Sequence, residues 1–406
     1  MKKRLVFAAV LAVLALAGCK EKSKPSVSFS MENTGSIYEV GELPDFDSLS
    51  ELQTLPNPFK MMDGSLVERQ DQWEKRRAEL MEMFQTYEIG RKFKTPKSCV
   101  SASFIDSEVD TIVVTVEVDG ETLSFNCPAY IPQGKGPFPA VIGVGYEAKA
   151  GNLPDDIFTS RKIAMIGFPY EEIIQSQQRR GMQPINDLYP EHLEIGSLAG
   201  WIWGVSRLID AIEQLREEAK IDVSHLAVSG CSIGGKLALY AGAFDERIAL
   251  TISQDAGAGG AASWRVLEHI VETERLGAVD SHWFLRKMKM FEADNVYKLP
   301  MDHHELCALI APRALLVFGN TDYWFMGDEA AYVSLYAARK VWEKFGKEDR
   351  IGWSFQGDHP LCSITDDQRA DLEAFVDKFL LGKIVETDVR KGENYKYVNV
   401  ERWCEW

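Results

Sequence analysis

The chain has 406 residues, of which 46% are hydrophobic and 26% charged, a balance typical of a globular protein with a large buried core. Its 61 acidic residues outnumber its 45 basic residues, and the formal net charge is −16. A surface this acidic disfavours nucleic acid as a partner, and the composition excludes a disordered chain or a small disulfide-stapled scaffold.

The first residues, 1–18, are predicted to form a lipoprotein signal peptide. Basic residues at 2–4 are followed by an apolar run over 5–16 and by the sequence Leu-Ala-Gly-Cys, which ends at Cys19. The run is too short to span a bilayer comfortably. The last four residues resemble a bacterial lipobox, which would make Cys19 the lipidated first residue of the mature chain. An ordinary secretory signal with an incidental cysteine is the alternative.

Either signal would export the protein. Lysine at position 20, directly after Cys19, resembles lipoproteins of the outer membrane, where the protein would occupy the periplasmic or the surface face. Removal of the leader takes the net charge to about −19. Polar residues over 19–44 suit a tether, and 45–406 would form the folded domain. The other cysteines are too dispersed for a metal site, so neither a metal nor another cofactor is expected.

Hydrophobic periodicity predicts the secondary structure of the domain. Residues 71–93 carry apolar side chains at helical spacing and predict a helix packed on a sheet. Over 111–131 the period changes to two around Asp119-Gly120, a strong hairpin signal. Apolar runs, separated mostly by helical patterns such as 200–219 and 330–345, then recur at 140–144, 163–167, 226–228, 249–252, 314–318 and 351–355. Such alternation predicts an α/β fold with a mostly parallel sheet covered by helices on both faces.

The central motif of the sequence is Gly-Cys-Ser-Ile-Gly over 230–234, between an apolar run and an apolar helical pattern. A serine at such a strand-to-helix turn, here Ser232, would point its hydroxyl outward, and the amide of Ile233 could donate to the oxyanion of a reacting carbonyl. The loop after Val144, around Gly145 and Tyr146, is expected to supply a second donor, because a glycine there lets the backbone approach a ligand. Taken alone, the motif is equally typical of a close-packed turn.

Polar residues at the ends of later strands complete the pattern. Asp255, Asp322 and His359 follow the strands predicted after Ser232, and the order serine, acid, histidine is that of the α/β-hydrolase fold. Ser232 would be the nucleophile and His359 the base that takes its proton. Both aspartates remain candidates for the acid that orients the base. The adjacent histidines at 303–304 follow an aspartate and are interpreted as capping and packing residues.

Several segments together resemble one family. They are Ser-Gly-Cys-Ser-Ile-Gly-Gly-Lys at 229–236 with its continuation at 241–265, Gly-Trp-Ile-Trp-Gly-Val-Ser-Arg at 200–207, His-Trp-Phe at 282–284, Leu-Pro-Met-Asp-His-His at 299–304 and Leu-Ile-Ala-Pro-Arg-Ala-Leu-Leu at 309–316. In these segments the chain resembles the glucuronoyl esterases of carbohydrate esterase family fifteen, from about residue 60 to 380. That family is similar in fold to other α/β-hydrolases and cleaves, without a metal, esters between 4-O-methyl-glucuronic acid on xylan and lignin alcohols.

The resemblance assigns roles to the same polar residues. It implies that Ser232 is the nucleophile and His359 the base. The acid of the family commonly lies in a Gln-Glu-Ser-Gly segment, which here reads Gln-Asp-Ala-Gly and contains Asp255. Some bacterial members place the acid one strand later, where Asp322 lies.

Further implications of the resemblance concern the surroundings of the serine. Lys236 matches a lysine that binds uronate hydroxyls, and Trp324 resembles a sugar-contacting tryptophan. Ile233 stands where the family motif Gly-Cys-Ser-Arg has arginine, and loss of one oxyanion donor can slow catalysis by about 10²–10³-fold. Some members pair the cysteine before the serine with one after the histidine, which implies a disulfide between Cys231 and Cys362.

The sequence therefore predicts a serine carbohydrate esterase that acts on 4-O-methyl-glucuronoyl esters of a polysaccharide such as glucuronoxylan. Because the arginine of the family is absent, an esterase for acetyl groups on xylan or for other acyl esters of carbohydrates is one alternative. A glycan-binding lipoprotein that kept the fold and lost the chemistry is the other. The intact set of Ser232, His359 and two candidate acids argues against it.

Overall fold

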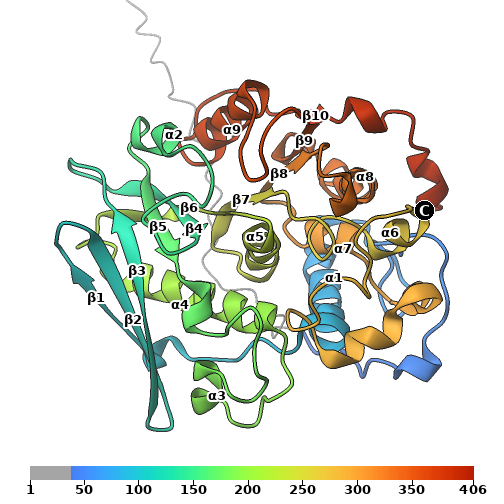
Figure 1. The fold of residues 1–406 in the computed structure, drawn as a ribbon, viewed down its shortest axis with the longest axis horizontal. Helices are drawn as coiled ribbons and strands as arrows, with labels where there is room; N and C mark the ends of the chain where they lie inside the picture. The colour runs from blue at the N-terminus through green and yellow to red at the C-terminus, as the bar shows by residue number, and fades with distance from the viewer. Residues whose placement is uncertain (1–37) are drawn as a thin grey trace, which may run out of the picture.

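A computed structural model describes residues 38–406, so the predicted signal peptide and most of the predicted tether lie outside the described residues. The described chain is built on a ten-stranded sheet in the order β1-β2-β3-β5-β4-β6-β7-β8-β9-β10 (Figure 1). The strands are β1 (Val100–Ile105), β2 (Asp110–Val118), β3 (Glu121–Tyr130), β4 (Phe138–Val144), β5 (Ala164–Phe168), β6 (Ile221–Cys231), β7 (Ile248–Gln254), β8 (Ala314–Asn320), β9 (Ile351–Gln356) and β10 (Arg390–Lys391). The first three strands and β5 pair antiparallel, and the pairs from β5 to β10 are parallel.

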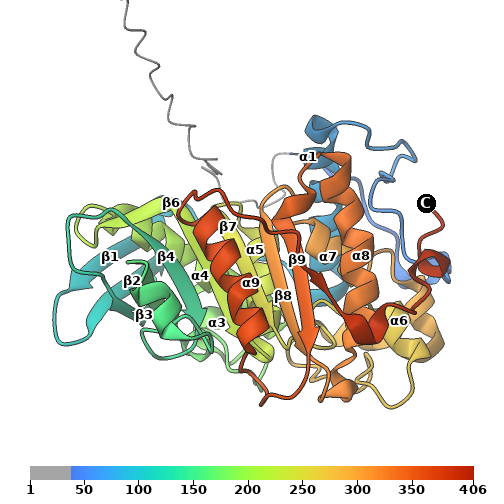
Figure 2. The same ribbon diagram turned by 90° about the horizontal axis from the view of Figure 1, so that it is seen from above.

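Helices cover both faces of the sheet, as the alternating pattern predicts. They are α1 (Gln70–Met83), α2 (Asp155–Thr159), α3 (Pro184–Leu188), α4 (Ser197–Leu215), α5 (Ile233–Phe244), α6 (Trp264–His269), α7 (His303–Ala308), α8 (Asp328–Lys344) and α9 (Asp366–Phe379). The larger core joins one face of the sheet to α4, α5 and α8, and the smaller core lies under α2 and α9 on the other face (Figure 2). Within residues 38–406, no helix has both the length and the apolar character needed to cross a membrane.

The predicted hairpin is confirmed. β2 and β3 pair residue for residue from Val118 opposite Glu121 outward, and the two turn residues Asp119 and Gly120 have φ of 52° and 90°. Positive φ at both positions matches the right-handed twist of the strands, which is why Asp-Gly is favoured there. In contrast to β3, where buried and exposed residues alternate, β7 and β8 are buried along their whole length because helices cover both their faces.

The helix expected at 71–93 forms, but its predicted packing on the sheet is wrong. α1 instead packs against other helices (Figure 1). Arg76 Nη2 lies 3.0 Å from Glu305 Oε1 on α7, and Arg77 Nε donates to the carbonyl oxygen of Leu309 at 3.0 Å. Both arginines are buried and require charged or carbonyl partners, which the ends of neighbouring helices offer and an apolar sheet face does not.

The strand order reverses direction at β4, which makes this part of the sheet a topological switch point. From β4 the chain crosses to β5 on one side and then returns to β6 on the other side of β4. Ligands of open α/β sheets bind at such a switch point, beyond the carboxyl ends of the strands. Ser232 directly follows β6 and therefore stands at this edge.

Candidate active site

The turn between β6 and α5 has the geometry of a nucleophile elbow. Ser232 has φ 54° and ψ −119°, a conformation that is strained for a residue with a side chain. Its N–H donates to the carbonyl oxygen of Gln254 at 3.0 Å, which ties the turn to β7. A Cβ at Gly230 would lie 2.4 Å from the oxygen of Gly234, and one at Gly235 would lie 2.4 Å from the Gln254 oxygen. Close packing therefore requires the glycines, and the turn leaves Ser232 partly exposed.

The expected oxyanion donors differ in their availability. Ile233 begins α5, and the first N–H groups of a helix have no acceptor within it, so this amide remains available at the positive end of the helix dipole. The Ile233 side chain packs against the larger core and brings no charge to the site. Gly145 N–H already donates to the carbonyl oxygen of Phe168 at 3.1 Å, so within the loop after Val144 this particular amide is engaged, and the expectation of a second donor from the loop stays a prediction.

A disulfide joins the elbow to the loop that carries His359. Cys231, directly before Ser232, is bonded to Cys362, three residues after His359, with their Cα atoms 5.6 Å apart. The disulfide implied by the family resemblance is therefore present in the structure. Sγ of both cysteines and a carboxylate oxygen of Asp255 lie within 4.8 Å of one another, but the bonded sulfurs leave no thiolate to bind a metal.

Asp255 lies beneath this disulfide. It follows β7 with φ 45°, is 2% exposed, and its Oδ2 accepts a hydrogen bond from Cys362 N–H at 2.9 Å. Within the described residues its Oδ1 has no hydrogen-bond partner. Burial raises the pKa of Asp255 to about 6, against the opposing effects of the Cys362 N–H and of the charge on His359. This carboxyl is therefore electrostatically coupled to His359.

Asp322 lies one strand further along the same edge and has a different environment. Its side chain is exposed, and its Oδ2 accepts a hydrogen bond from the N–H of Asp358 at 2.7 Å. Asp358 immediately precedes His359, so Asp322 holds the backbone of the histidine loop. Neither aspartate makes a direct hydrogen bond to His359 in the described structure.

Asn320, at the end of β8, is a contact of His359 that the sequence analysis missed. It is 2% exposed, and its Nδ2 donates to the His359 carbonyl oxygen at 2.8 Å and lies 3.1 Å from His359 Nδ1. Its Oδ1 accepts from Asp322 N–H at 3.1 Å. His359 Nε2 is buried and has no hydrogen-bond partner among the described residues. The signal that singled out Asp322, a polar residue at the carboxyl end of a strand, applies equally to Asn320.

Lys236 lies on the first turn of α5 and is buried, unlike an ordinary solvated helix residue. Its Nζ donates to the carbonyl oxygen of Ala256 at 2.6 Å and lies 5.0 Å from the centre of the Trp283 ring. Burial lowers the pKa of Lys236 to about 8, opposed by the negative charge of Glu274. Trp283 was not singled out from the sequence, although it lies in the His-Trp-Phe segment. Trp324 is 54% exposed and follows β8.

The two adjacent histidines have the structural role that the sequence predicts. Asp302 caps α7, and His303 and His304 are fully buried. His303 Nε2 lies 2.8 Å from Glu88 Oε1, and His304 Nε2 lies 2.8 Å from the carbonyl oxygen of Pro56. Both rings are held by these buried partners, so the base expected after the last strand has no rival in this pair.

The sheet topology, the elbow and the order of the polar residues define an α/β-hydrolase with the site of a serine esterase. The sequence model for the family "Glucuronyl esterase, fungi" matches residues 114–346, more than half of the chain. The 4-O-methyl-glucuronoyl methylesterase of Thermothelomyces thermophilus is 36% identical over 361 residues, 87% of this chain and 87% of that protein. The enzyme of that name from Hypocrea jecorina is 35% identical over 373 residues, 90% of this chain and 77% of that protein.

Solved structures agree with this assignment. The glucuronoyl esterase catalytic domain from Hypocrea jecorina has a TM-score of 0.81 and 34% identity, and the match covers 90% of this chain and 98% of that one. A family 15 carbohydrate esterase from Caldicellulosiruptor kristjansonii, also a glucuronoyl esterase, has a TM-score of 0.72 and 28% identity over 88% of this chain and 99% of its own. The chain belongs to the glucuronoyl esterase family and is a carboxylic ester hydrolase.

The raised pKa of Asp255 predicts a pH-dependent gain in stability for Asp255→Asn. Because the folded-state pKa of about 6 exceeds the ordinary value of 3.8, the native state loses stability as pH rises through this interval and the buried carboxyl ionises. Asparagine cannot ionise, so we expect the free energy of unfolding to rise by about 1–3 kcal/mol at pH 8 and by much less at pH 4. Urea unfolding of the wild type and the variant at both pH values measures this free energy. Asp322→Asn, at an exposed position, is the control, and equal effects of Asp255→Asn at both pH values would contradict the prediction.

Proposed function

We propose that this protein hydrolyses 4-O-methyl-glucuronoyl esters that link xylan to lignin alcohols. The observation that carries the proposal is the elbow serine, Ser232, with the buried Lys236 one turn behind it and stacked over Trp283, in a chain that matches 4-O-methyl-glucuronoyl methylesterases along most of its length. A glucuronoyl esterase from Sporotrichum thermophile, with a TM-score of 0.80 and 34% identity over 88% of this chain and 95% of that one, has been solved with methyl 4-O-methyl-β-D-glucopyranuronate.

The reaction follows from the chemistry of the three proposed catalytic side chains. Ser232 Oγ attacks the carbonyl carbon of the uronate ester while His359 takes the hydroxyl proton. The N–H of Ile233 donates to the oxyanion of the tetrahedral intermediate. When this intermediate collapses, the bond to the alcohol breaks and His359 gives its proton to the departing oxygen. Water, activated by His359, then attacks the acyl-enzyme, releasing the uronic acid and restoring the serine.

We propose Asp255 as the acid that assists His359. Two observations support it over Asp322. The charge of His359 acts on the pKa of Asp255, and Asp255 Oδ1 is buried with no hydrogen-bond partner among the described residues. Asp322 is exposed, and one of its oxygens holds the Asp358 N–H. A buried carboxylate also stabilises the imidazolium more strongly than an exposed one, because the surrounding dielectric is lower.

The two aspartates are predicted to differ in their effect on turnover. Asp255→Asn should lower kcat on a uronate ester by about 10³–10⁴-fold, since the imidazolium loses its counter-charge. Asp322→Asn keeps an oxygen that accepts from Asp358 N–H and should cost less than about tenfold, as expected for one exposed hydrogen bond. Steady-state kinetics on benzyl glucuronate measures both, with circular dichroism as the control for folding. A larger loss of kcat in Asp322→Asn than in Asp255→Asn would identify Asp322 as the acid that assists His359.

The absence of the family arginine favours a second candidate function, hydrolysis of acetyl or other acyl esters on a polysaccharide. Ile233 offers its backbone amide but no side-chain charge for a uronate carboxyl group. The purified domain is therefore tested on benzyl glucuronate and on an aryl acetate, beside Ser232→Ala. We expect cleavage of the uronate ester by the wild type and a loss of at least 10³-fold in the variant.

Other results of this test would contradict the proposal in distinct ways. Cleavage of the aryl acetate alone would show that the protein, with Ile233 in place of the family arginine, acts on acetyl esters and not on uronate esters. Absence of turnover on both esters, with retained oligosaccharide binding, would favour a glycan-binding role. Turnover that survives in Ser232→Ala would exclude Ser232 as the nucleophile.

We also propose that the chain is exported as a lipoprotein and anchored through Cys19, with the outer membrane as its location. The leader and the sequence around Cys19 support this, and the Cys231–Cys362 disulfide is of the kind that persists in oxidising compartments. In a bacterial host we expect a mature chain that starts at a diacylglycerol-modified Cys19 and partitions into the membrane fraction. Mass spectrometry of the mature N-terminus tests it. In Cys19→Ala, a chain that still partitions into membranes would contradict the proposal.

A further inference from the structure

A cavity lined in part by His282, the residue before Trp283, has a cationic lining. It encloses about 460 Å³ and is lined by Arg179, Arg180, Arg286 and Lys289, with His282 on its wall. No carboxylate belongs to the lining of this cavity in the described part of the chain. In a chain with a net charge of −16, four cations that line one hollow are a local concentration of positive charge.

Arg180 brings to this cavity a positive charge that forms no ion pair with a carboxylate of residues 38–406. The Arg180 guanidinium donates to the carbonyl oxygens of Ile195, Ser281 and Phe284 at 2.5, 2.8 and 2.6 Å. These carbonyls satisfy its N–H groups and hold it in place, but they do not neutralise its charge. Burial lowers the pKa of Arg180, and the charge of Arg286 adds to this effect, against the opposing negative charges of Glu194 and Asp280. A bound anion would relieve this unfavourable environment.

The cations at the rim are free to bind a ligand. Arg179 and Lys289 are exposed, and neither forms an ion pair with any of residues 38–406. Arg286 lies 3.4 Å from Glu194, but both side chains are more than half exposed, so this pair is weak and exchangeable. Guanidinium groups bind carboxylates in a bidentate manner, which gives such a cluster specificity for planar anions.

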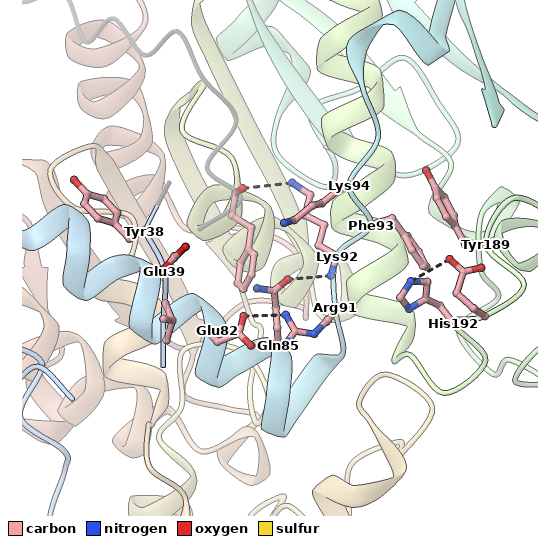
Figure 3. Close-up of a pocket in the computed structure, with 13 residues that line it drawn as sticks. Tyr38, Glu39, Glu82, Gln85, Arg91, Lys92, Phe93, Lys94, Tyr189 and His192 are labelled. Atoms are coloured by element: carbon pink, nitrogen blue, oxygen red, sulfur yellow. Dashed lines mark hydrogen bonds and ion pairs between the residues drawn. The ribbon is translucent and has the colours of Figure 1, made fainter. Parts of the chain in front are cut away.

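The larger hollow shown in Figure 3 does not share these properties. It encloses about 610 Å³ and is lined by Arg91, Lys92 and Lys94 together with three carboxylates, those of Glu39 and Glu82 (Figure 3) and that of Glu191. Arg91 is bonded to Glu82, and Lys92 Nζ lies 2.6 Å from Ser206 Oγ. Three carboxylates therefore balance the three lysine and arginine charges of this lining, whereas the lining of the cavity around Arg180 has cations and no carboxylate.

The cationic cavity is connected to the candidate site through a short, ordered segment. His282 lines the cavity, and the ring of the next residue, Trp283, lies 5.0 Å from Lys236 Nζ, one helical turn after Ser232. Gln178 is buried and donates to the His282 carbonyl oxygen at 3.0 Å, which fixes this wall. A polymer bound at Ser232 could thus extend along Trp283 into the cavity.

We propose that this cavity binds a free uronate carboxylate on the same acidic xylan chain whose ester is cleaved at Ser232. The inference rests on the proposed function, since that function supplies a polymer that carries uronic acids. The acidic protein repels such a polyanion over most of its surface, and the cluster of Arg179, Arg180, Arg286 and Lys289 supplies the local attraction that brings the polymer to the site.

The test compares binding of two polymers by proteins that carry Ser232→Ala. The polymers are saponified glucuronoxylan, in which every uronate is a free acid, and the same polymer after carboxyl reduction. One protein also carries Arg179→Gln, Arg286→Gln and Lys289→Gln. The matched control carries Lys135→Gln, Arg216→Gln and Lys220→Gln, three exposed cations near the amino edge of the sheet. Affinity electrophoresis and calorimetry at low and high salt measure binding, and circular dichroism checks folding.

We expect the cavity variant to bind the free-acid polymer about tenfold more weakly than the Ser232→Ala parent, since each exposed ion pair accounts for a factor of a few. The control should bind like the parent, and carboxyl reduction or high salt should weaken the parent to the level of the cavity variant. With Ser232 intact, the three cavity substitutions should leave kcat/KM on benzyl glucuronate, which has no second carboxylate, unchanged.

Several results would overturn the assignment. They are parental affinity in the cavity variant, equal binding of the carboxyl-reduced polymer, and an equal loss in the control. Binding to vesicles of phosphatidylglycerol through these cations, without binding to the polymer, would assign the cavity to a membrane surface instead. A wild-type chain that binds the acidic polymer through these cations yet does not cleave benzyl glucuronate supports the cavity and contradicts the proposed reaction, so the two failures are distinguishable.

Discussion

The site depends on one covalent constraint, the bond between Cys231 and Cys362. It connects the residue before Ser232 with the loop after His359, two segments that are separated by 131 residues in the chain. Asp255 adds a second connection between them, because it follows β7 beside the elbow and accepts a hydrogen bond from Cys362 N–H. A nucleophile and its base must be held within a fraction of an ångström, and two exposed loops do not achieve this unaided.

This arrangement is costly for the folded state. Ser232, Asp255, Asp358 and Cys362 all have positive φ, between 45° and 64°, at the same edge of the sheet. Such conformations persist only where the surrounding structure over-determines them, and here a sheet buried on both faces supplies that support. The buried carboxyl of Asp255 adds the cost of removing a charge from water. Strain and desolvation concentrated at one place are typical of a functional site.

Much of the fold was predictable because its signals are local or strongly periodic. The Asp119-Gly120 hairpin, the buried parallel strands and the elbow all follow from residue types that their backbone conformations require. The packing of α1 was not predictable from its apolar stripe, since the same stripe suits a sheet or a helix and only the buried arginines distinguish the two. The engaged amide of Gly145 depends on β5, a strand that the local sequence does not contain.

The polar residues of the site were predictable as a set but not as individuals. Position at the ends of successive strands identified Asp255, Asp322 and His359, yet burial separates the two aspartates, and burial is a property of the assembled fold. Asn320 has the same sequence signal and was missed because an amide does not titrate. The pairing of Cys231 with Cys362 came from the family resemblance, because six dispersed cysteines allow many pairings.

The measurement that tests the central claim most directly is the rate at which an aryl phosphonate labels Ser232, with the labelled peptide identified by mass spectrometry. The wild type is compared with the double variant Cys231→Ala and Cys362→Ala at a temperature where both are folded. If the disulfide holds Ser232 and His359 together, the label appears on Ser232 in the wild type and forms at least about 10²-fold more slowly in the double variant. Equal rates in the two proteins, or a label on another residue, would contradict the account.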